Sequence, residues 1–269
     1  MSTNIYNHEF HARLKSMIIW SLAMAALIIF FSSLFPAFSD QAAVMNDFLA
    51  RYPAQLRAAF GLDKIDLSTV LGFYAFTLVF VQLCMAIQAG NYGFGLVSIE
   101  ETELTADFLL SKPVRRTQVL TSKLLAAITC LIITELVVWV CTFASILLFR
   151  AGHEYQTGTL LLLLFSLLIF QLIFLGIGLF ISLLLRRVRS VTPYGLGLAF
   201  GAYVINGFSG VFGEIKLELI TPFKHLDPTY IVLHASYNAP LVLLDVAVIL
   251  ITIMVSYWLY TRRDIPAVS

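Results

Sequence analysis

The chain has 269 residues, of which 59% are hydrophobic and 12% are charged, and its formal net charge at pH 7 is +1. Soluble domains contain about 25% charged residues, so this composition excludes an ordinary soluble protein and predicts an integral membrane protein. The balanced charge also argues against a nucleic-acid partner, because domains that bind nucleic acids are typically basic.

Six apolar stretches are long enough to cross a membrane, which takes roughly 20 residues of helix. They are residues 17–35, 70–89, 124–149, 159–185, 191–212 and 241–260. Their continuous apolarity excludes the alternating strands, about ten residues long, of an outer-membrane barrel. The sequence therefore predicts an all-α fold: a single polytopic membrane domain over residues 1–269, built as a bundle of six transmembrane helices.

The residues before the first span have a helical pattern of their own. Tyr6, Phe10, Leu14 and Met17 recur at helical spacing among polar residues. This pattern predicts an amphipathic interfacial helix over residues 1–16, and an ordinary solvated N-terminus is the alternative. No cleavable signal peptide is expected, because the first apolar stretch has the length of a span.

A polar segment separates the second and third spans. Ser98 and Glu101 fit a capping box, which predicts a helix start at Ser98, and Pro113 ends the helix. Acids precede Lys112 in the order that the helix dipole favours. We expect a cytoplasmic helix over residues 98–112 that touches another protein, with a solvated loop helix as the alternative.

The last long connection, residues 213–240, contains three prolines and is mixed in polarity. Irregular backbone near a membrane must be covered by protein or water, so we expect this segment to pack over the outer mouth of the bundle. We assign it to the extracytoplasmic side.

The cations fix an expected orientation. With both termini in the cytoplasm of a multi-pass protein of the cell membrane, most of the 17 lysines and arginines lie inside, as the positive-inside rule requires. These inside residues are Arg13, Lys15, Lys112, Arg115, Arg116, Lys123, Arg186, Arg187, Arg189, Arg262 and Arg263.

The sequence gives no indication of a cofactor site. The chain lacks a Gly-x-x-x-x-Gly-Lys-Ser/Thr phosphate loop, and its histidines and cysteines have no metal-ligand spacing. All three cysteines lie in predicted spans, where we expect them to be packing residues. They are Cys84, Cys130 and Cys141.

The polar segment carries a run that resembles a known family. The matching residues are Glu101, Thr105, Asp107, Leu109, Leu110, Ser111, Pro113, Val114 and Arg116. In these residues the chain resembles the membrane subunits, or permeases, of type 2 ATP-binding-cassette (ABC) transporters. Leu104 departs from the family pattern, which usually has glycine at that position.

The resemblance implies a transport subunit, most often an exporter, without an ATPase site of its own. It implies separate ABC ATPase subunits that hold ATP and Mg, a second copy of the permease or a paralogue, and surrounding membrane lipid. The residues expected to dock on the ATPase are Glu100, Glu101, Glu103, Leu104, Thr105, Asp107, Phe108, Arg115 and Arg116.

Two other functions compete with this one. An ion-coupled secondary transporter or channel would use the intramembrane acids Glu135 and Asp245, although we expect Glu135 to be a hydrogen-bonded contact between helices, to a glutamine or tyrosine on a neighbouring helix. An intramembrane serine protease would use the serine of Gly207-Phe-Ser-Gly210, but it needs a histidine base, and all five histidines lie outside the predicted spans.

Overall fold

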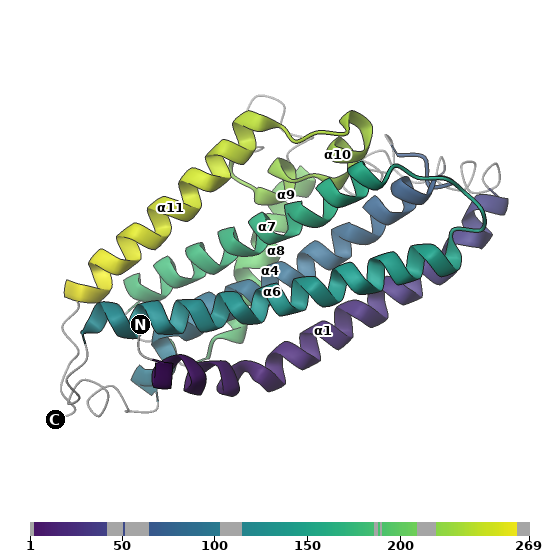
Figure 1. The fold of residues 1–269 in the computed structure, drawn as a ribbon. Helices are drawn as coiled ribbons and strands as arrows, with labels where there is room; N and C mark the ends of the chain where they lie inside the picture. The colour runs from purple at the N-terminus through teal and green to yellow at the C-terminus, as the bar shows by residue number, and fades with distance from the viewer. Residues whose placement is uncertain are drawn as a thin grey trace.

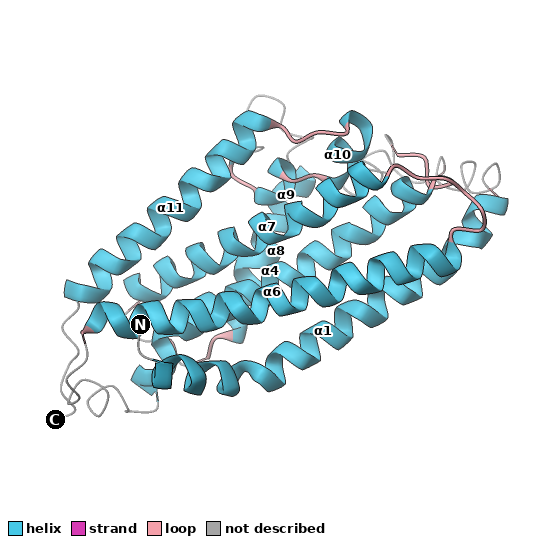
Figure 2. Ribbon diagram, in the orientation of Figure 1, coloured by secondary structure: helices cyan, strands magenta, loops and turns pink. Residues whose placement is uncertain are grey.

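The computed structural model describes residues 3–41, 51, 65–102, 115–185, 188, 190–208 and 219–262. Throughout this described part the regular structure is helical, without strands, which confirms the all-α class (Figure 2). The helices are α1 (Thr3–Asp40), α4 (Val70–Thr102), α6 (Arg116–Phe149), α7 (Thr157–Leu184), α8 (Thr192–Phe208), α9 (Pro222–His225), α10 (Pro228–His234) and α11 (Ala239–Arg262).

Five of these helices, α1, α4, α6, α7 and α11, are long and apolar enough to cross a membrane. The predicted count of six is not confirmed. The fifth predicted span, residues 191–212, corresponds to α8, of which the structure describes 17 residues. Residues 209–212 of that predicted span lie outside the described residues.

The long helices run side by side, with α11 along the outside of α7 (Figure 1). Helices α4 and α7 form the centre of the bundle. In the most apolar stretches of α4 and α7, 67% and 61% of the residues are buried, against 11% in that of α11. Helix α4 packs mainly on α7, and α1 packs mainly on α6.

Close approach of α4 and α7 requires glycine. A Cβ atom on Gly93 would lie 2.4 Å from the carbonyl oxygen of Leu175, and one on Gly178 would lie 2.9 Å from that of Gly90. Small residues let membrane helices approach backbone to backbone, where packing and interhelical contacts stabilise the pair. This contact holds the C-terminal half of α4 against α7.

The N-terminal part of the chain is helical, as predicted. Residues 3–16 form the beginning of α1, which is continuous from Thr3 to Asp40, and their location at the membrane interface stays a prediction. Tyr6 donates a hydrogen bond to Thr129 of α6 over 3.1 Å, so this end of α1 packs against protein. The amphipathic pattern therefore marks a face that contacts the bundle.

The predicted helix start at Ser98 is wrong. Helix α4 runs without a break from Val70 to Thr102, so the capping-box pattern lies inside a helix. The second span was predicted to end at residue 89, but residues up to Val97 continue as helix and are mostly buried. Packing of the glycines on α7 and α8 keeps this polar, glycine-rich stretch helical and overrides the local start signal.

Two short helices, α9 and α10, connect α8 to α11 and pack against the bundle. Gln82 of α4 donates a hydrogen bond to the carbonyl oxygen of Leu226 over 2.9 Å. The Tyr237 hydroxyl donates to the carbonyl oxygen of Leu162 over 2.6 Å. The described part of the 213–240 segment is thus covered by α4 and α7, while its extracytoplasmic location stays a prediction.

Candidate functional site

The predicted docking residues fall between the end of α4 and the start of α6. Glu100 and Glu101 belong to the last turns of α4, and Arg115 and Arg116 stand at the start of α6. The remaining ones lie outside the described residues: Glu103, Leu104, Thr105, Asp107 and Phe108. The structure describes the two helix ends that flank this segment, the end of α4 and the start of α6.

Those two helix ends meet the start of α1 and the end of α11 at one end of the bundle (Figure 1). We call this the coupling end. A buried lysine lies at its centre: Lys123 of α6 has a relative exposure of 2%. Because an unpaired buried ammonium is very costly, its partners define the site.

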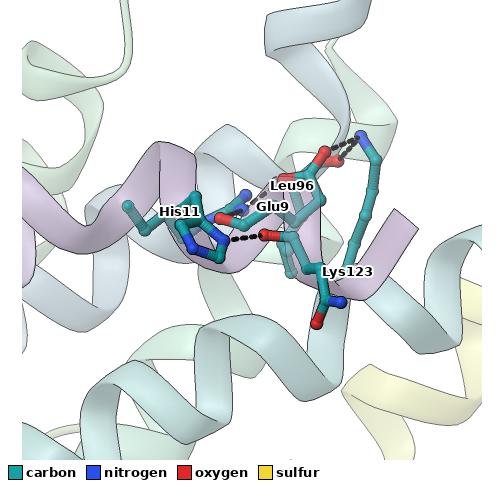
Figure 3. Close-up of polar contacts among 6 residues, drawn as sticks. Glu9, His11, Leu96 and Lys123 are labelled. Atoms are coloured by element: carbon teal, nitrogen blue, oxygen red, sulfur yellow. Dashed lines mark hydrogen bonds and ion pairs between the residues drawn. The ribbon is translucent and has the colours of Figure 1, made fainter. Parts of the chain in front are cut away.

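Lys123 joins three helices (Figure 3). Its Nζ donates a hydrogen bond to the carbonyl oxygen of Leu96, near the end of α4, over 2.8 Å. The same Nζ lies 3.5 Å from Oε1 of Glu9 on α1. One side chain of α6 therefore holds the last part of α4 and the start of α1 together.

Glu9 is held from its own helix as well. Nη1 of Arg13 donates both to Oε2 of Glu9 and, over 3.1 Å, to the carbonyl oxygen of Glu9. Arg13 is itself buried, with an exposure of 7%. Charge-assisted hydrogen bonds of this kind fix the position of a carboxylate more firmly than neutral ones do. Contacts within this chain alone therefore orient Glu9 toward Lys123.

A second set of contacts joins the start of α6 to the end of α11. Nη1 of Arg116 lies 3.5 Å from the carbonyl oxygen of Thr261, and the hydroxyl groups of Thr121 and Tyr257 are 2.8 Å apart. All four helices at the coupling end are thus linked through polar contacts.

Comparison with known proteins identifies the family of this chain. A sequence profile described as ABC-2 family transporter protein matches residues 3–265. The chain belongs to this family. No curated protein and no solved structure matches the chain. The family assignment confirms the resemblance to permease subunits of type 2 ABC transporters, and the long apolar helices confirm a multi-pass membrane protein.

In this ABC-2 family protein the intramembrane acids have individual partners. Glu135, 5% exposed, accepts a hydrogen bond from Nε1 of Trp139 over 2.7 Å. Trp139 lies one turn along the same helix as Glu135. The hydrogen bond of Glu135 is therefore within α6, and not to a neighbouring helix as predicted. Asp245 of α11 lies against His225 of α9, with 2.6 Å between Oδ1 and Nδ1.

The described residues leave the competing functions untested. The described residues contain no group of three or more histidine, cysteine or acidic side chains arranged to hold a metal ion. Ser209, the serine of the candidate protease motif, lies outside the described residues. Membership of the ABC-2 family favours ATP-driven transport over an ion-coupled carrier or an intramembrane protease.

Sequence reasoning missed the central residues of the coupling end. Lys123 was counted only as a cytoplasmic charge, because a lysine at the edge of an apolar stretch usually extends its ammonium to the interface. Glu9 and Arg13, four residues apart on a helix, do show a local pair in the sequence. No local pattern, however, connects that pair to Lys123.

Proposed function

We propose that this protein is the membrane subunit of an ATP-driven exporter, working with separate ABC ATPase subunits that bind ATP and Mg. In this proposal the segment over residues 98–112 docks on an ATPase. The transport path lies between two permease subunits, either identical copies or paralogues. The family assignment supports this kind of machine, in which the ATPase is generally a separate subunit.

The observation that carries the proposal is the bond from Lys123 to the carbonyl oxygen of Leu96. Leu96 precedes the point where α4 leads into the docking segment, and Lys123 lies early in α6, where the chain returns. A push on the segment would move the end of α4, and Lys123 would pass that movement to α6 and, through Glu9, to α1. The contact thus supports a mechanical route from an ATPase into the bundle.

The distribution of charge supports a cytoplasmic coupling end. The parts of α1, α6 and α11 that meet at the coupling end contain several lysines and arginines, namely Arg13, Lys15, Arg116, Lys123 and Arg262. Positive residues concentrate on the cytoplasmic side of membrane proteins. An ATPase that draws on cytoplasmic ATP would reach the docking segment from that side.

The test is co-purification with a candidate ABC ATPase subunit that is expressed together with this protein. We expect the two to form a complex in detergent and the ATPase to turn over ATP faster in that complex, while the permease alone hydrolyses none. Replacing Glu100, Glu101 and Glu103 together with lysine should weaken the complex at least tenfold. The matched control is Glu154→Lys, an exposed acid between α6 and α7 at the other end of the bundle.

Two results would reject the proposal. One is ATP hydrolysis by the purified permease without any partner. The other is unchanged affinity for the ATPase after the triple charge reversal, with the unfolding temperature also unchanged.

A further inference from the structure

A small cavity lies between α1, α4 and α6 at the end of the bundle opposite the coupling end. Its volume is about 20 Å³, and its wall consists of residues from these three helices and of Arg150, which follows α6. Three residues of the wall carry hydroxyl groups, namely Ser32 of α1, Tyr74 of α4 and Ser145 of α6. Each helix thus supplies one hydroxyl-bearing side chain to the same cavity.

The two serines of the wall are buried without a partner from the described part of the chain. Ser32 and Ser145 are 7% and 1% exposed, and no hydrogen bond joins either hydroxyl to another described residue. Several other helical serines donate instead to a carbonyl oxygen of the preceding turn, namely Ser33, Ser39, Ser122, Ser166 and Ser182. Because a buried hydroxyl without a hydrogen bond is costly, these two need a partner in the cavity.

The size and the chemistry of the cavity fit one water molecule. A cavity must offer at least about 10–15 Å³ and two to four polar partners to hold a water. Each serine hydroxyl can both donate and accept, so it suits a water in either orientation. The Tyr74 hydroxyl lies 2.6 Å from Oγ1 of Thr142 and can make one further hydrogen bond. These groups give a water about three partners, the usual number for a buried one.

The composition of the wall distinguishes water from other occupants. A hard cation takes carboxylate and carbonyl oxygens, whereas the wall contains no acidic residue and includes the positively charged Arg150. A purely apolar cavity would stay dry. Apolar side chains do form much of this wall, namely Phe35, Val70, Phe73, Ile146 and Phe149, but the serines interrupt them with two unpartnered hydroxyls.

The cavity joins the same three helices that Lys123 joins at the coupling end. There, Lys123 of α6 contacts Glu9 of α1 and the carbonyl oxygen of Leu96 of α4. A water bound to the three hydroxyl groups would connect α1, α4 and α6 at their other end. Hydrogen bonds through such a water are enthalpically almost as favourable as direct ones.

We propose that the cavity between Ser32, Tyr74 and Ser145 is a binding site for one ordered water, which bridges α1, α4 and α6. The bridge fixes the relative positions of these helices at the end opposite the docking segment. It does not depend on how the protein is powered.

Hydroxyl-radical footprinting of the full chain in lipid nanodiscs tests the water site. Radicals that an X-ray pulse generates from a bound water oxidise the side chains beside it. Phe35 and Phe73 line the cavity, whereas Phe170 and Phe174 lie in the apolar core, and all four are at most 4% exposed. We expect Phe35 and Phe73 to be oxidised at least about fivefold faster than the two reference rings, because a dry apolar core supplies no water.

A variant that fills the cavity separates a bound water from other causes of oxidation. Ser145→Val removes a hydroxyl and is larger than serine by one methyl group, so it should expel the water. Oxidation of Phe35 and Phe73 should then fall to the rate of the reference rings. The unfolding temperature should also fall, because the Ser32 hydroxyl loses its partner. The matched control is Ser33→Val, which changes an exposed serine of α1 and should leave the oxidation unchanged.

Three results would overturn the proposal. Equal oxidation of all four rings in the unaltered protein would show a dry cavity, and so would a higher unfolding temperature in Ser145→Val with unchanged oxidation. Stabilisation of the unaltered protein, but not of Ser145→Val, by sodium chloride relative to choline chloride would show a bound cation instead of water. If Ser145→Val does not fold, the comparison of the four rings in the unaltered protein and in Ser33→Val still decides.

Discussion

Nζ of Lys123 on α6 lies 3.5 Å from Oε1 of Glu9 on α1 while it donates a hydrogen bond to the carbonyl oxygen of Leu96 on α4. One buried ammonium thus fixes the relative positions of three helices at the end of the bundle where the docking segment is attached. The arrangement predicts that Lys123 matters for stability and for communication with an ATPase.

Replacing Lys123 with methionine should lower the free energy of unfolding by about 2 kcal/mol, because hydrogen bonds to charged groups contribute roughly 1.5–3 kcal/mol. It should also reduce stimulation of the partner ATPase. Lys123→Arg should retain more of both than Lys123→Met, since it keeps the charge and a donor. Lys15→Met, which removes an exposed lysine from α1, is the control. Thermal unfolding and ATP turnover of the complex are the measurements. Equal behaviour of Lys123→Met and Lys15→Met would contradict the prediction.

Glu135→Gln should leave ATP-driven activity largely intact. The amide oxygen of glutamine can still accept the N–H of Trp139, and the energy source in the proposed mechanism is the partner ATPase rather than a proton at Glu135. Glu135→Leu removes the acceptor and should cost about 1–3 kcal/mol of stability by leaving the indole N–H unpaired. The measurements are ATP turnover of the complex and the unfolding temperature. Loss of turnover in Glu135→Gln with an unchanged unfolding temperature would contradict this prediction.

The contact between α4 and α7 predicts strong sensitivity at Gly93. A Cβ atom there would meet the carbonyl oxygen of Leu175 at 2.4 Å, so Gly93→Ala should force the helices apart. Overpacking typically costs 1–3 kcal/mol, and about 3 kcal/mol is expected here because the obstructing atom is backbone. Gly197→Ala in α8 meets no atom within 4 Å and serves as the control. The unfolding temperatures of the two variants should differ clearly, and equal temperatures would refute the close contact.

The orientation is testable with single cysteines. His8→Cys adds an exposed thiol near the start of α1, and Glu154→Cys adds one between α6 and α7. We expect a membrane-impermeant maleimide to label Glu154→Cys in intact cells and His8→Cys only in inverted membranes. The native cysteines Cys84, Cys130 and Cys141 provide the background signal in the unaltered protein. The reverse labelling pattern would place the docking segment outside and remove it from the reach of cytoplasmic ATP.

Hydropathy was sufficient to predict an all-α membrane protein and the positions of the five long apolar helices that the described residues contain, because the cost of exposing backbone to lipid acts on each segment separately. The run around Glu101 and Pro113 was sufficient to indicate the ABC-2 family. Both signals are local, so they can be read from consecutive residues.

Helix boundaries and polar partners depended on the tertiary structure. Helix α4 continues past residue 89 because Gly93 packs against α7, and α6 starts before residue 124 because Lys123 finds Leu96 and Glu9 inside the bundle. His225 and Asp245 likewise become a pair only when α9 folds back onto α11. Whether a polar residue can be buried is decided by the groups that meet it, and those groups come from helices far apart in the sequence.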